Sequence, residues 1–344
     1  MREPVSENPG PARALEPFLT VQPEGLRAEA LGAVLDPGVP VARAILSHAH
    51  ADHAVDGHGA VWATPETLAL YRRRNPAWAG AAKALSYGEE HEENGLRIRM
   101  VPAGHVLGSA QVLFSDGEHT LLYTGDFKRR VGRTAAPAEA PPAAVLLTET
   151  TFGLPVFRFP PTAELESRLV AACREAIAEG ETPVLLAYSL GKAQEAAAIL
   201  TDAGIPSVLH GAAWKLLPEF AAAGISLPLS RAYETGPPEP GEALITPPST
   251  ARAEMVRRIK RRRVIYLSGW AVREAARAEF DADVLLPMSD HADFEDLLEH
   301  AREVAPRRVV TLHGFAGDFA RILEARGIPA EPLTGREERP AADA

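Results

Sequence analysis

The stretch LSHAHADHAVDGHG, residues 46–59, packs four histidines and two aspartates into fourteen positions. His48 and His50 follow an apolar run of β type, ARAILS, and Asp52 and His53 come soon after. Alternate residues at a strand end point to the same side, so His48 and His50 can hold one metal ion while Asp52 and His53 reach a second. The pattern predicts a metal site, although a histidine cluster can also be a solvated surface loop.

Three further residues of metal-binding type stand just past apolar strand patterns. His105 ends IRMVPAGH, Asp126 ends TLLYTGD and His313 ends RVVTLH. Strand ends of an α/β sheet share one edge, so these residues can converge with the histidine loop on a dinuclear metal site. Cys173, the single cysteine, lies in an amphipathic helix pattern and is predicted to be an inert core thiol, which leaves histidines and carboxylates as ligands. The remaining histidines are predicted to be surface or core residues: His58, His91, His119, His210 and His300.

Composition limits the class of protein. A chain of 344 residues that is 46% hydrophobic can form one large domain or two smaller ones. Neither a signal-peptide pattern at the amino terminus nor a run of eighteen apolar residues is found, so we expect a cytoplasmic protein without a membrane partner. The formal charge of −10 argues against non-specific coating of nucleic acid but allows local phosphate binding.

Short β-type runs alternate with helical patterns, which indicates α/β layers. From Leu26 to about Thr151 strands dominate, with one helix pattern, TPETLALYRRR. From Pro160 to about Arg277 long helices separate short apolar strands, as is typical of a parallel sheet with helices on its faces. From Asp283 a strand, a helix, a strand and a helix follow.

Several of these motifs resemble a known family. SHAHADH, GHVLGSAQ and YTGDF are similar to the signature loops of the metallo-β-lactamase fold, in the order that fold uses. LLTETTFG with Glu149, YSLGKAQE, MSDHADFEDL with His291 and LHG with His313 resemble the β-CASP nuclease branch, which includes RNase J, the nuclease subunit of the polyadenylation machinery and Artemis. The resemblance spans residues 36–314. The short length and SGWAVR, residues 268–273, are most similar to the bacterial ligase-associated DNA damage response exonucleases.

The resemblance implies an α/β protein, a metallo-β-lactamase αββα sandwich with an inserted β-CASP α/β domain. Residues 1–158 would form the first part of the metallo-β-lactamase domain, 159–281 the β-CASP domain and 282–344 the second part. The changes of pattern near Pro160 and Asp283 fall where the insertion should begin and end.

The resemblance also implies a ligand set for two divalent metal ions. One ion would be bound by His48, His50 and His105, the other by Asp52, His53 and His313, with Asp126 as the bridge. Zinc is the expected metal and manganese the alternative, since histidine and carboxylate sites accept both. Asp36, in VLDPG, matches an aspartate that orients the ligand loop.

The implied chemistry is attack of water on phosphorus at the metal pair, with Asp52 and Asp126 in the catalytic centre. His291, paired with Glu149, would protonate the leaving oxygen, because a neighbouring carboxylate favours the imidazolium. Glu149 could instead be a helix cap, and His291 a loop residue.

Substrate binding is predicted at cationic residues. Lys192, in YSLGKAQE, stands at a strand-turn-helix where a phosphate can sit at a helix N-terminus. The other candidates follow Asp126 or lie in segments expected to face the cleft between domains: Arg129, Arg130, Arg158 and Arg273. The run RRIKRRR, residues 257–263, could follow a nucleic-acid backbone, but such runs are usually solvated helix faces.

Three functions remain open. The first is a 5′-to-3′ exonuclease of single-stranded DNA in repair, working beside a DNA ligase and a helicase. The second is an RNA-processing nuclease of the same fold. His313 does not decide between the two and counts mildly toward RNA, because the eukaryotic DNA members such as Artemis lack a histidine there while RNA members keep it. The third is an inactive scaffold subunit, against which the complete set of ligands and proton-transfer residues counts. Hydrolysis of small molecules is disfavoured because those enzymes lack the inserted domain.

Overall fold

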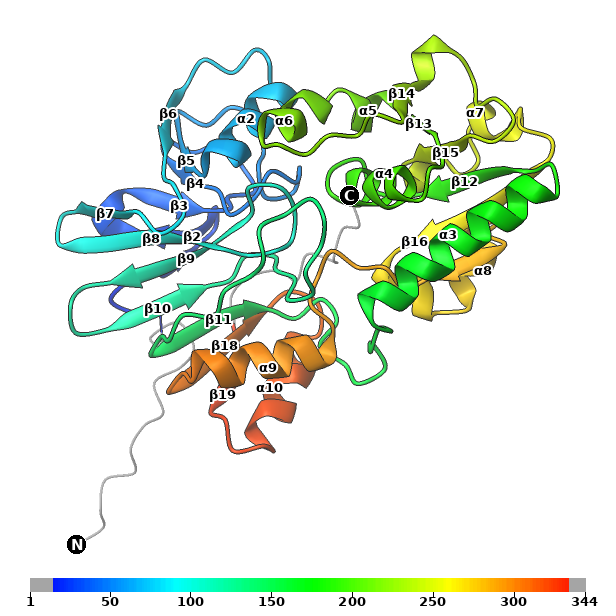
Figure 1. The fold of residues 1–344 in the computed structure, drawn as a ribbon. Helices are drawn as coiled ribbons and strands as arrows, with labels where there is room; N and C mark the ends of the chain where they lie inside the picture. Colours follow the sequence, from blue (N-terminus) through cyan, green and yellow to red (C-terminus); the bar gives the residue numbers. More distant parts are fainter. Residues whose placement is uncertain (1–14, 334–344) are drawn as a thin grey trace, which may run out of the picture.

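A computed structural model describes residues 15–333, and three β-sheets organise them (Figure 1). Two sheets face each other in the first lobe, where α2 lies outside one sheet and α9 and α10 lie outside the other. The third sheet, with helices α3 to α8, forms the second lobe. The arrangement of the first lobe is the predicted αββα sandwich, so the predicted fold class is confirmed.

The first sheet has the strand order β1-β2-β3-β4-β5-β6, and β3 to β6 run parallel. Its strands are β1 (Thr20–Gln22), β2 (Gly25–Ala28), β3 (Ala33–Leu35), β4 (Ala44–Ile45), β5 (Ala60–Ala63) and β6 (Ala81–Ala84). Helix α2 (Pro65–Arg74) covers this sheet. It begins at Thr64, whose hydroxyl accepts the Thr67 N–H, and three arginines in its last turn suit the negative end of the helix dipole.

The second sheet has the order β19-β18-β11-β10-β9-β8-β7. Its strands are β7 (Glu90–Glu93), β8 (Leu96–Pro102), β9 (Ala110–Ser115), β10 (Thr120–Tyr123), β11 (Val145–Glu149), β18 (Arg308–Leu312) and β19 (Ala330–Pro332). Strands β10, β11, β18 and β19 are parallel neighbours, with Glu149 level with Leu312. The chain therefore leaves the sheet after β11 and returns to the adjacent position after the whole second lobe.

The main core of the first lobe lies between its two sheets, and its members include Ile45, Trp62, Phe114 and Leu147. A second core lies under α9 (Phe294–Val304) and α10 (Ala316–Glu324). Asp293 caps α9 by accepting the Asp296 N–H. Because both faces of the second sheet are buried, its central strands are fixed, and so are the loops that follow them.

The third sheet is entirely parallel, with the order β14-β13-β15-β12-β16-β17. Its strands are β12 (Thr182–Leu186), β13 (Ser207–Leu209), β14 (Ser230–Ala232), β15 (Ala243–Thr246), β16 (Arg262–Leu267) and β17 (Val284–Leu286). Cores on both faces bury them under α3 (Thr162–Ala178) and α4 (Lys192–Asp202) on one side and α7 (Glu254–Arg257) and α8 (Ala275–Phe280) on the other. The short elements are α5 (Gly211–Trp214), α6 (Leu217–Ala222) and the 3-10 turns η1 (Glu29–Leu31), η2 (Tyr233–Thr235), η3 (Pro248–Thr250) and η4 (Gly269–Val272).

All strands of the third sheet come from residues 182–286, which supports an inserted domain. We keep the division into residues 1–158, 159–281 and 282–344 as a proposal, and note that β17 extends the third sheet past residue 281. Cys173 is buried and free of a disulfide, as expected. None of the helices within residues 15–333 has both the length and the apolar composition needed to cross a bilayer.

Candidate metal centre

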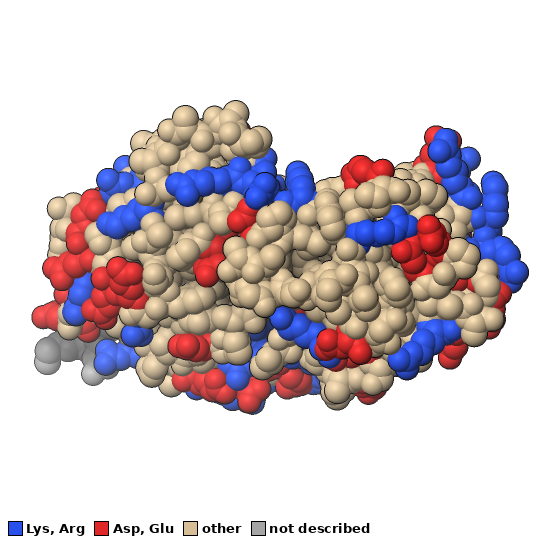
Figure 2. Space-filling model, turned by 45° about the horizontal axis from the view of Figure 1, so that its top comes forward, with Lys and Arg blue, Asp and Glu red and all other residues tan. Residues whose placement is uncertain are grey.

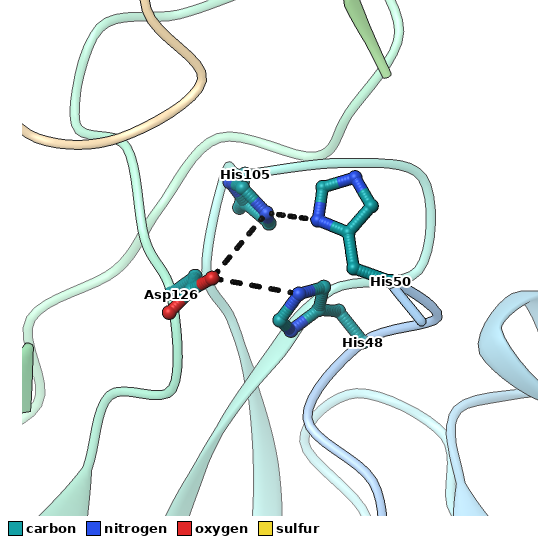
Figure 3. Close-up of side chains that lie close together, drawn as sticks. All are labelled: His48, His50, His105 and Asp126. Atoms are coloured by element: carbon teal, nitrogen blue, oxygen red, sulfur yellow. Dashed lines mark hydrogen bonds and ion pairs between the residues drawn. The ribbon is translucent and has the colours of Figure 1, made fainter. Parts of the chain in front are cut away.

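The metal-type residues lie in the loops that follow β4, β8, β10 and β18 of the first lobe. Figure 3 shows four of them, His48, His50, His105 and Asp126, with their side chains close together. The loops after β4 and β10 touch each other at Gly125, which has a φ of +54°. A Cβ on Gly125 would lie 2.6 Å from the Cβ of Ser47, so only glycine allows this approach. The glycine of YTGDF therefore brings Asp126 next to His48.

Asp126 is the centre of the site. Its side chain is buried, and four imidazole nitrogens face the same carboxylate oxygen. The distances from Asp126 Oδ2 are 3.6 Å to His48 Nε2, 3.4 Å to His53 Nε2, 3.9 Å to His105 Nε2 and 4.0 Å to His291 Nε2. Burial raises the pKa of Asp126 to about 6, against the opposing charges of His53 and His291.

One group of potential ligands consists of His48, His50, His105 and Asp126, whose ligand atoms all lie within 4.8 Å of one another. His50 Nδ1 and His105 Nε2 are 3.0 Å apart. The opposite nitrogens of these two rings meet backbone carbonyls, which can only accept: His50 Nε2 is 3.1 Å from Leu190 O and His105 Nδ1 is 2.7 Å from Asp290 O. These bonds fix the tautomers and leave both facing nitrogens as lone-pair donors.

His48 completes this group of nitrogen donors. Its Nδ1 lies 2.9 Å from the hydroxyl of Ser47, while its Nε2 is buried and makes no hydrogen bond within residues 15–333. Burial lowers the pKa of His50 to about 4 and holds the pKa values of His48 and His105 well below the usual range. Neutral imidazole is the form that binds metals, so these donors fit a divalent ion of the zinc or manganese type.

Asp36 orders the second group, which contains His48 and His53. Its buried carboxylate accepts the Ser47 N–H at 2.7 Å, the Ser47 hydroxyl at 2.6 Å, the Tyr123 hydroxyl at 2.8 Å and His53 Nδ1 at 3.1 Å. Burial alone would raise the pKa of Asp36, but the bonds from His53 and Ser47 lower it. Asp36 thus lies behind the ligand loop, where the sequence predicted it to act.

The carboxylates around His53 favour a positive charge at this position. Burial would lower its pKa, yet Asp126, Asp36 and Asp52 together raise it to about 10. The carboxylates therefore attract positive charge to this point, and a divalent cation would supply it in place of a proton.

Asp52 and His313 flank the second group. Asp52 Oδ2 lies 3.7 Å from His53 Nε2. The ring of His313 is 6.1 Å from that of His53, and His313 has a φ of +58°, an uncommon conformation for a residue other than glycine. Neither belongs to a group of ligand atoms within 4.8 Å among the described residues, so their predicted role as ligands stays a prediction.

The proposed proton-transfer pair forms beside the metal cluster. His291 Nδ1 lies 2.9 and 3.1 Å from the two carboxylate oxygens of Glu149, which also accept the N–H groups of Phe127 at 3.0 Å and Thr151 at 3.3 Å. Burial would raise the pKa of Glu149, but His291 and these bonds lower it. Nε2 of His291 faces Asp126, so the pair presents one ring nitrogen to the cluster.

Two backbone carbonyls orient rings of the site, and sequence reasoning missed both. The carbonyls of Leu190 and Asp290 orient His50 and His105, although neither residue has a side chain that signals this role. The approach requires Gly191, with a φ of +89°, because a Cβ there would lie 2.4 Å from Val106 Cγ1. The glycine of YSLGKAQE thus lets the start of α4 pack against the loop of His105.

Two of the predicted substrate-binding cations, Arg129 and Arg158, pair with carboxylates outside the cluster. Arg129 makes a two-pronged ion pair with Glu303, at 2.8 and 2.7 Å. Arg158 Nη2 lies 2.6 Å from Glu295 Oε1. These partners, both on α9, weaken the predicted role of the two arginines, which stays a prediction.

The other cations vary in exposure. Lys192 is buried, with its Nζ 2.7 Å from Asp290 Oδ1. Arg130 binds Asp293 and Asp296, and half-exposed Arg273 lies over the ring of Trp270 at 5.1 Å. In Figure 2 cationic and acidic side chains alternate over the visible face.

Comparison with known proteins agrees with this geometry. Residues 13–170 match the model of the metallo-beta-lactamase superfamily, so this part of the chain carries a metallo-beta-lactamase domain. A probable DNA ligase of Opitutus terrae is 40% identical over 308 residues, 89% of this chain and 30% of that protein. The endoribonuclease ysh1 of Aspergillus fumigatus is 31% identical over 195 residues, 46% of this chain and 22% of that protein.

Two further relatives extend the comparison. The RNase J-like protein of Methanocaldococcus jannaschii is 33% identical over 124 residues, 35% of this chain and 29% of that protein. The chain thus spans less than a third of the length of these three curated relatives. A solved structure of a protein of unknown function from Enterococcus faecalis superposes with a TM-score of 0.61 at 14% identity, covering 86% of this chain and 80% of that one, which supports the fold alone.

Proposed function

We propose that this chain is a metal-dependent nuclease that trims single-stranded DNA from the 5′ end during DNA repair. The observation that carries the proposal is the buried cluster of histidine and aspartate donors around Asp126, with the Glu149–His291 pair directly beside it. A superfamily with nuclease relatives supports a hydrolase of this kind.

Two divalent ions would occupy the centre, with zinc as the first expectation and manganese as the alternative. One would be held by His48, His50 and His105, the other by Asp52, His53 and His313, and Asp126 would serve both. When bound, such ions neutralise the charge of a phosphodiester and make water a stronger nucleophile at neutral pH.

The residues of the chain then handle position and protons. Glu149 holds the Nδ1–H of His291, so the second ring nitrogen faces the cluster and can give a proton to the leaving oxygen. The carboxylate next to the ring favours the protonated form, as a general acid requires. Asp36 keeps His53 and the ligand loop in place.

A single strand is the substrate that suits this location. The site lies where the loops of the first lobe meet Leu190 and Asp290 of the second-lobe side, so a substrate must enter between protein segments. A duplex is too wide for such an entrance unless it opens. A helicase would supply the single strand.

The choice of DNA rests on the similarity to a protein named probable DNA ligase, which spans nearly the whole of this chain. A ligase would seal the ends that trimming prepares, and we therefore propose functional association with a ligase. RNA is the second candidate, favoured by the relatives named endoribonuclease and RNase J-like protein.

The test is digestion of end-labelled single-stranded DNA and RNA, linear and circular, with zinc and with manganese. We expect a 5′-labelled DNA strand to release its label first as mono- or short oligonucleotides, and blunt duplex to be a poor substrate. Equal cutting of circular and linear strands, or a strong preference for RNA, would replace this proposal with an RNA-processing endonuclease.

A further inference from the structure

A pocket lies directly beside His291, between the loop that follows β10 and the start of α4. Half of its lining residues have ionisable side chains, and the other half are mostly apolar. The ionisable ones are Lys128, Arg130, Lys192, Glu195, Asp290 and His291. The pocket is thus continuous with the proposed proton-transfer pair and lies outside the set of metal donors. Sequence reasoning selected the arginines that follow Asp126 and passed over Lys128.

Lys128 is the unusual member of this lining. Its side chain is only 8% exposed, yet its ammonium makes no ion pair and no hydrogen bond within residues 15–333. The exposed remainder faces the pocket. A lysine this deeply buried normally has a paired charge, because an uncompensated buried charge is unfavourable.

The other charges of the pocket are already matched. Lys192 binds Asp290 at 2.7 Å, and Arg130 binds Asp293 and Asp296. The carboxylate of Glu195 accepts the Arg133 N–H at 2.9 and 3.0 Å and the Thr134 hydroxyl at 2.8 Å. Among the cations that line the pocket, Lys128 is therefore the one for which the described residues provide no direct partner.

The charge of Lys128 also acts on its neighbours. It opposes the positive charge of Lys192 and attracts Asp290 from beyond ion-pair distance. An anion placed in the pocket would offset the repulsion between Lys128 and Lys192, and it would give Lys128 a partner. A tetrahedral phosphate oxygen suits a lysine ammonium, which binds phosphate as a compact point charge.

We propose that Lys128 and this pocket form a phosphate-binding subsite. In a bound strand, the subsite holds the phosphate group that neighbours the phosphate being cut. The strand part of the proposal rests on the proposed nuclease function, whereas the affinity for a phosphate group does not. Lys128 is then a positioning residue, since it contacts a phosphate neighbouring the reacting one and keeps the strand in register with His291.

The first experiment measures binding without cleavage. The full-length protein with its metals is titrated by calorimetry with thymidine 5′-monophosphate, with thymidine 3′-monophosphate and with thymidine. Lys128→Met is compared with Lys215→Met, which removes the same charge from an exposed position at the end of α5. We expect Lys128→Met to bind a monophosphate about ten- to a hundredfold more weakly, the usual value of a charged hydrogen bond, and Lys215→Met to bind like the unmodified chain.

The second experiment identifies the source of the phosphate. Binding of a short DNA strand is measured in a His291→Ala background, with the strand 5′-phosphorylated, 5′-hydroxyl or circular. Lys128→Met should reduce the slope of log affinity against log salt concentration by about 0.7, the contribution of one phosphate contact on a single strand. A loss confined to the 5′-phosphorylated strand identifies a terminal phosphate, and an equal loss on all three identifies an internal one.

Thermal unfolding separates this role from a structural one. Removing an unpaired buried charge should leave Lys128→Met at least as stable as the parent without phosphate, while the stabilisation by added monophosphate is lost. An unfolded Lys128→Met chain, or unchanged monophosphate affinity and salt slope, overturns the subsite. If no nucleic acid is cleaved but Lys128→Met still loses monophosphate binding, the nuclease function fails and the subsite stands.

Discussion

Replacing one carboxylate oxygen of Asp36 should disturb the ordered conformation of the ligand loop. In Asp36→Asn the side chain keeps its shape, but one oxygen becomes an NH₂ group. Oδ1 accepts the Ser47 N–H, and Oδ2 accepts the Ser47 hydroxyl, the Tyr123 hydroxyl and His53 Nδ1. If the NH₂ group takes the Oδ1 position, it faces the Ser47 N–H, which can only donate. If it takes the Oδ2 position, the Ser47 and Tyr123 hydroxyls can turn and accept from it, but the His53 Nδ1–H loses its acceptor.

The magnitude follows from this count. A buried donor left without an acceptor costs about 1–3 kcal/mol, and the loss of the carboxylate charge also weakens the bond from His53. We expect the free energy of unfolding of the Asp36→Asn chain to fall by about 2–4 kcal/mol. Because His53 and His48 are ordered through Asp36 and Ser47, metal affinity should fall by about 10- to 100-fold.

The change in stability is measured by urea unfolding after a chelator has removed the metal. The change in metal affinity is measured separately, by competition with a metal indicator. Tyr123→Phe is the matched control, because it removes one neutral donor from the same carboxylate and leaves the charge; it should lose about 1 kcal/mol and retain its metal. Asp36→Asn with the stability and metal affinity of the parent chain would refute the role given to Asp36.

Three further predictions concern the site and the core. The purified protein should carry close to two metal equivalents, and Asp126→Ala should lose much of both in elemental analysis; no bound metal, and no activity restored by zinc or manganese, contradicts the assignment. His291→Ala and Glu149→Ala should keep metal and strand affinity but slow single-turnover cleavage by about 10²–10⁴-fold, and equal rates would remove His291 from the mechanism. Burial lowers the pKa of His300 to about 3, whereas the usual value is 6.5, so between these pH values the unfolded chain binds more protons than the folded chain. The free energy of unfolding should therefore fall as the pH falls through this window, by up to about 1.4 kcal/mol per pH unit. His300→Phe should remove that part of the slope in urea titrations at several pH values, and an unchanged slope would show that His300 is not its source.

The elements that carry the site were predictable because local pattern and tertiary position agree in them. Strands β8, β10, β11 and β18 are apolar runs followed by a metal-type residue or ending in Glu149. Strands β6 and β7 carry no apolar strand pattern in the sequence: β6 is mostly exposed and β7 has the sequence EHEE. Each lies at the edge of its sheet and forms because a neighbouring strand offers hydrogen bonds, not because of an apolar alternation.

The candidate site could be predicted from the sequence only in part. Spacing and strand ends predicted the residues that meet around Asp126, and the resemblance supplied Glu149 and His291. Spacing could not predict Lys128, because nothing in the sequence FKRR tells the buried cation from the paired ones. Burial and the absence of a counter-charge are properties of the folded chain, and only the packing of α4 against the loop after β10 produces them.

The backbone contacts of the second lobe couple the metal centre to the position of that lobe. Leu190 O and Asp290 O hold the outer nitrogens of His50 and His105. Leu190 belongs to the second lobe, and Asp290, in the segment that leads from β17 to α9, is tied to that lobe by its ion pair with Lys192. If the lobes separated, these two imidazoles would lose the bonds that fix their tautomers, and the facing nitrogens would no longer be held as donors. Ion pairs between the lobes, Arg133 with Glu166 and Arg73 with Glu219, oppose that separation. If His50 and His105 bind a metal as proposed, metal binding and closure of the lobes would stabilise each other, since each needs the same arrangement of these two rings.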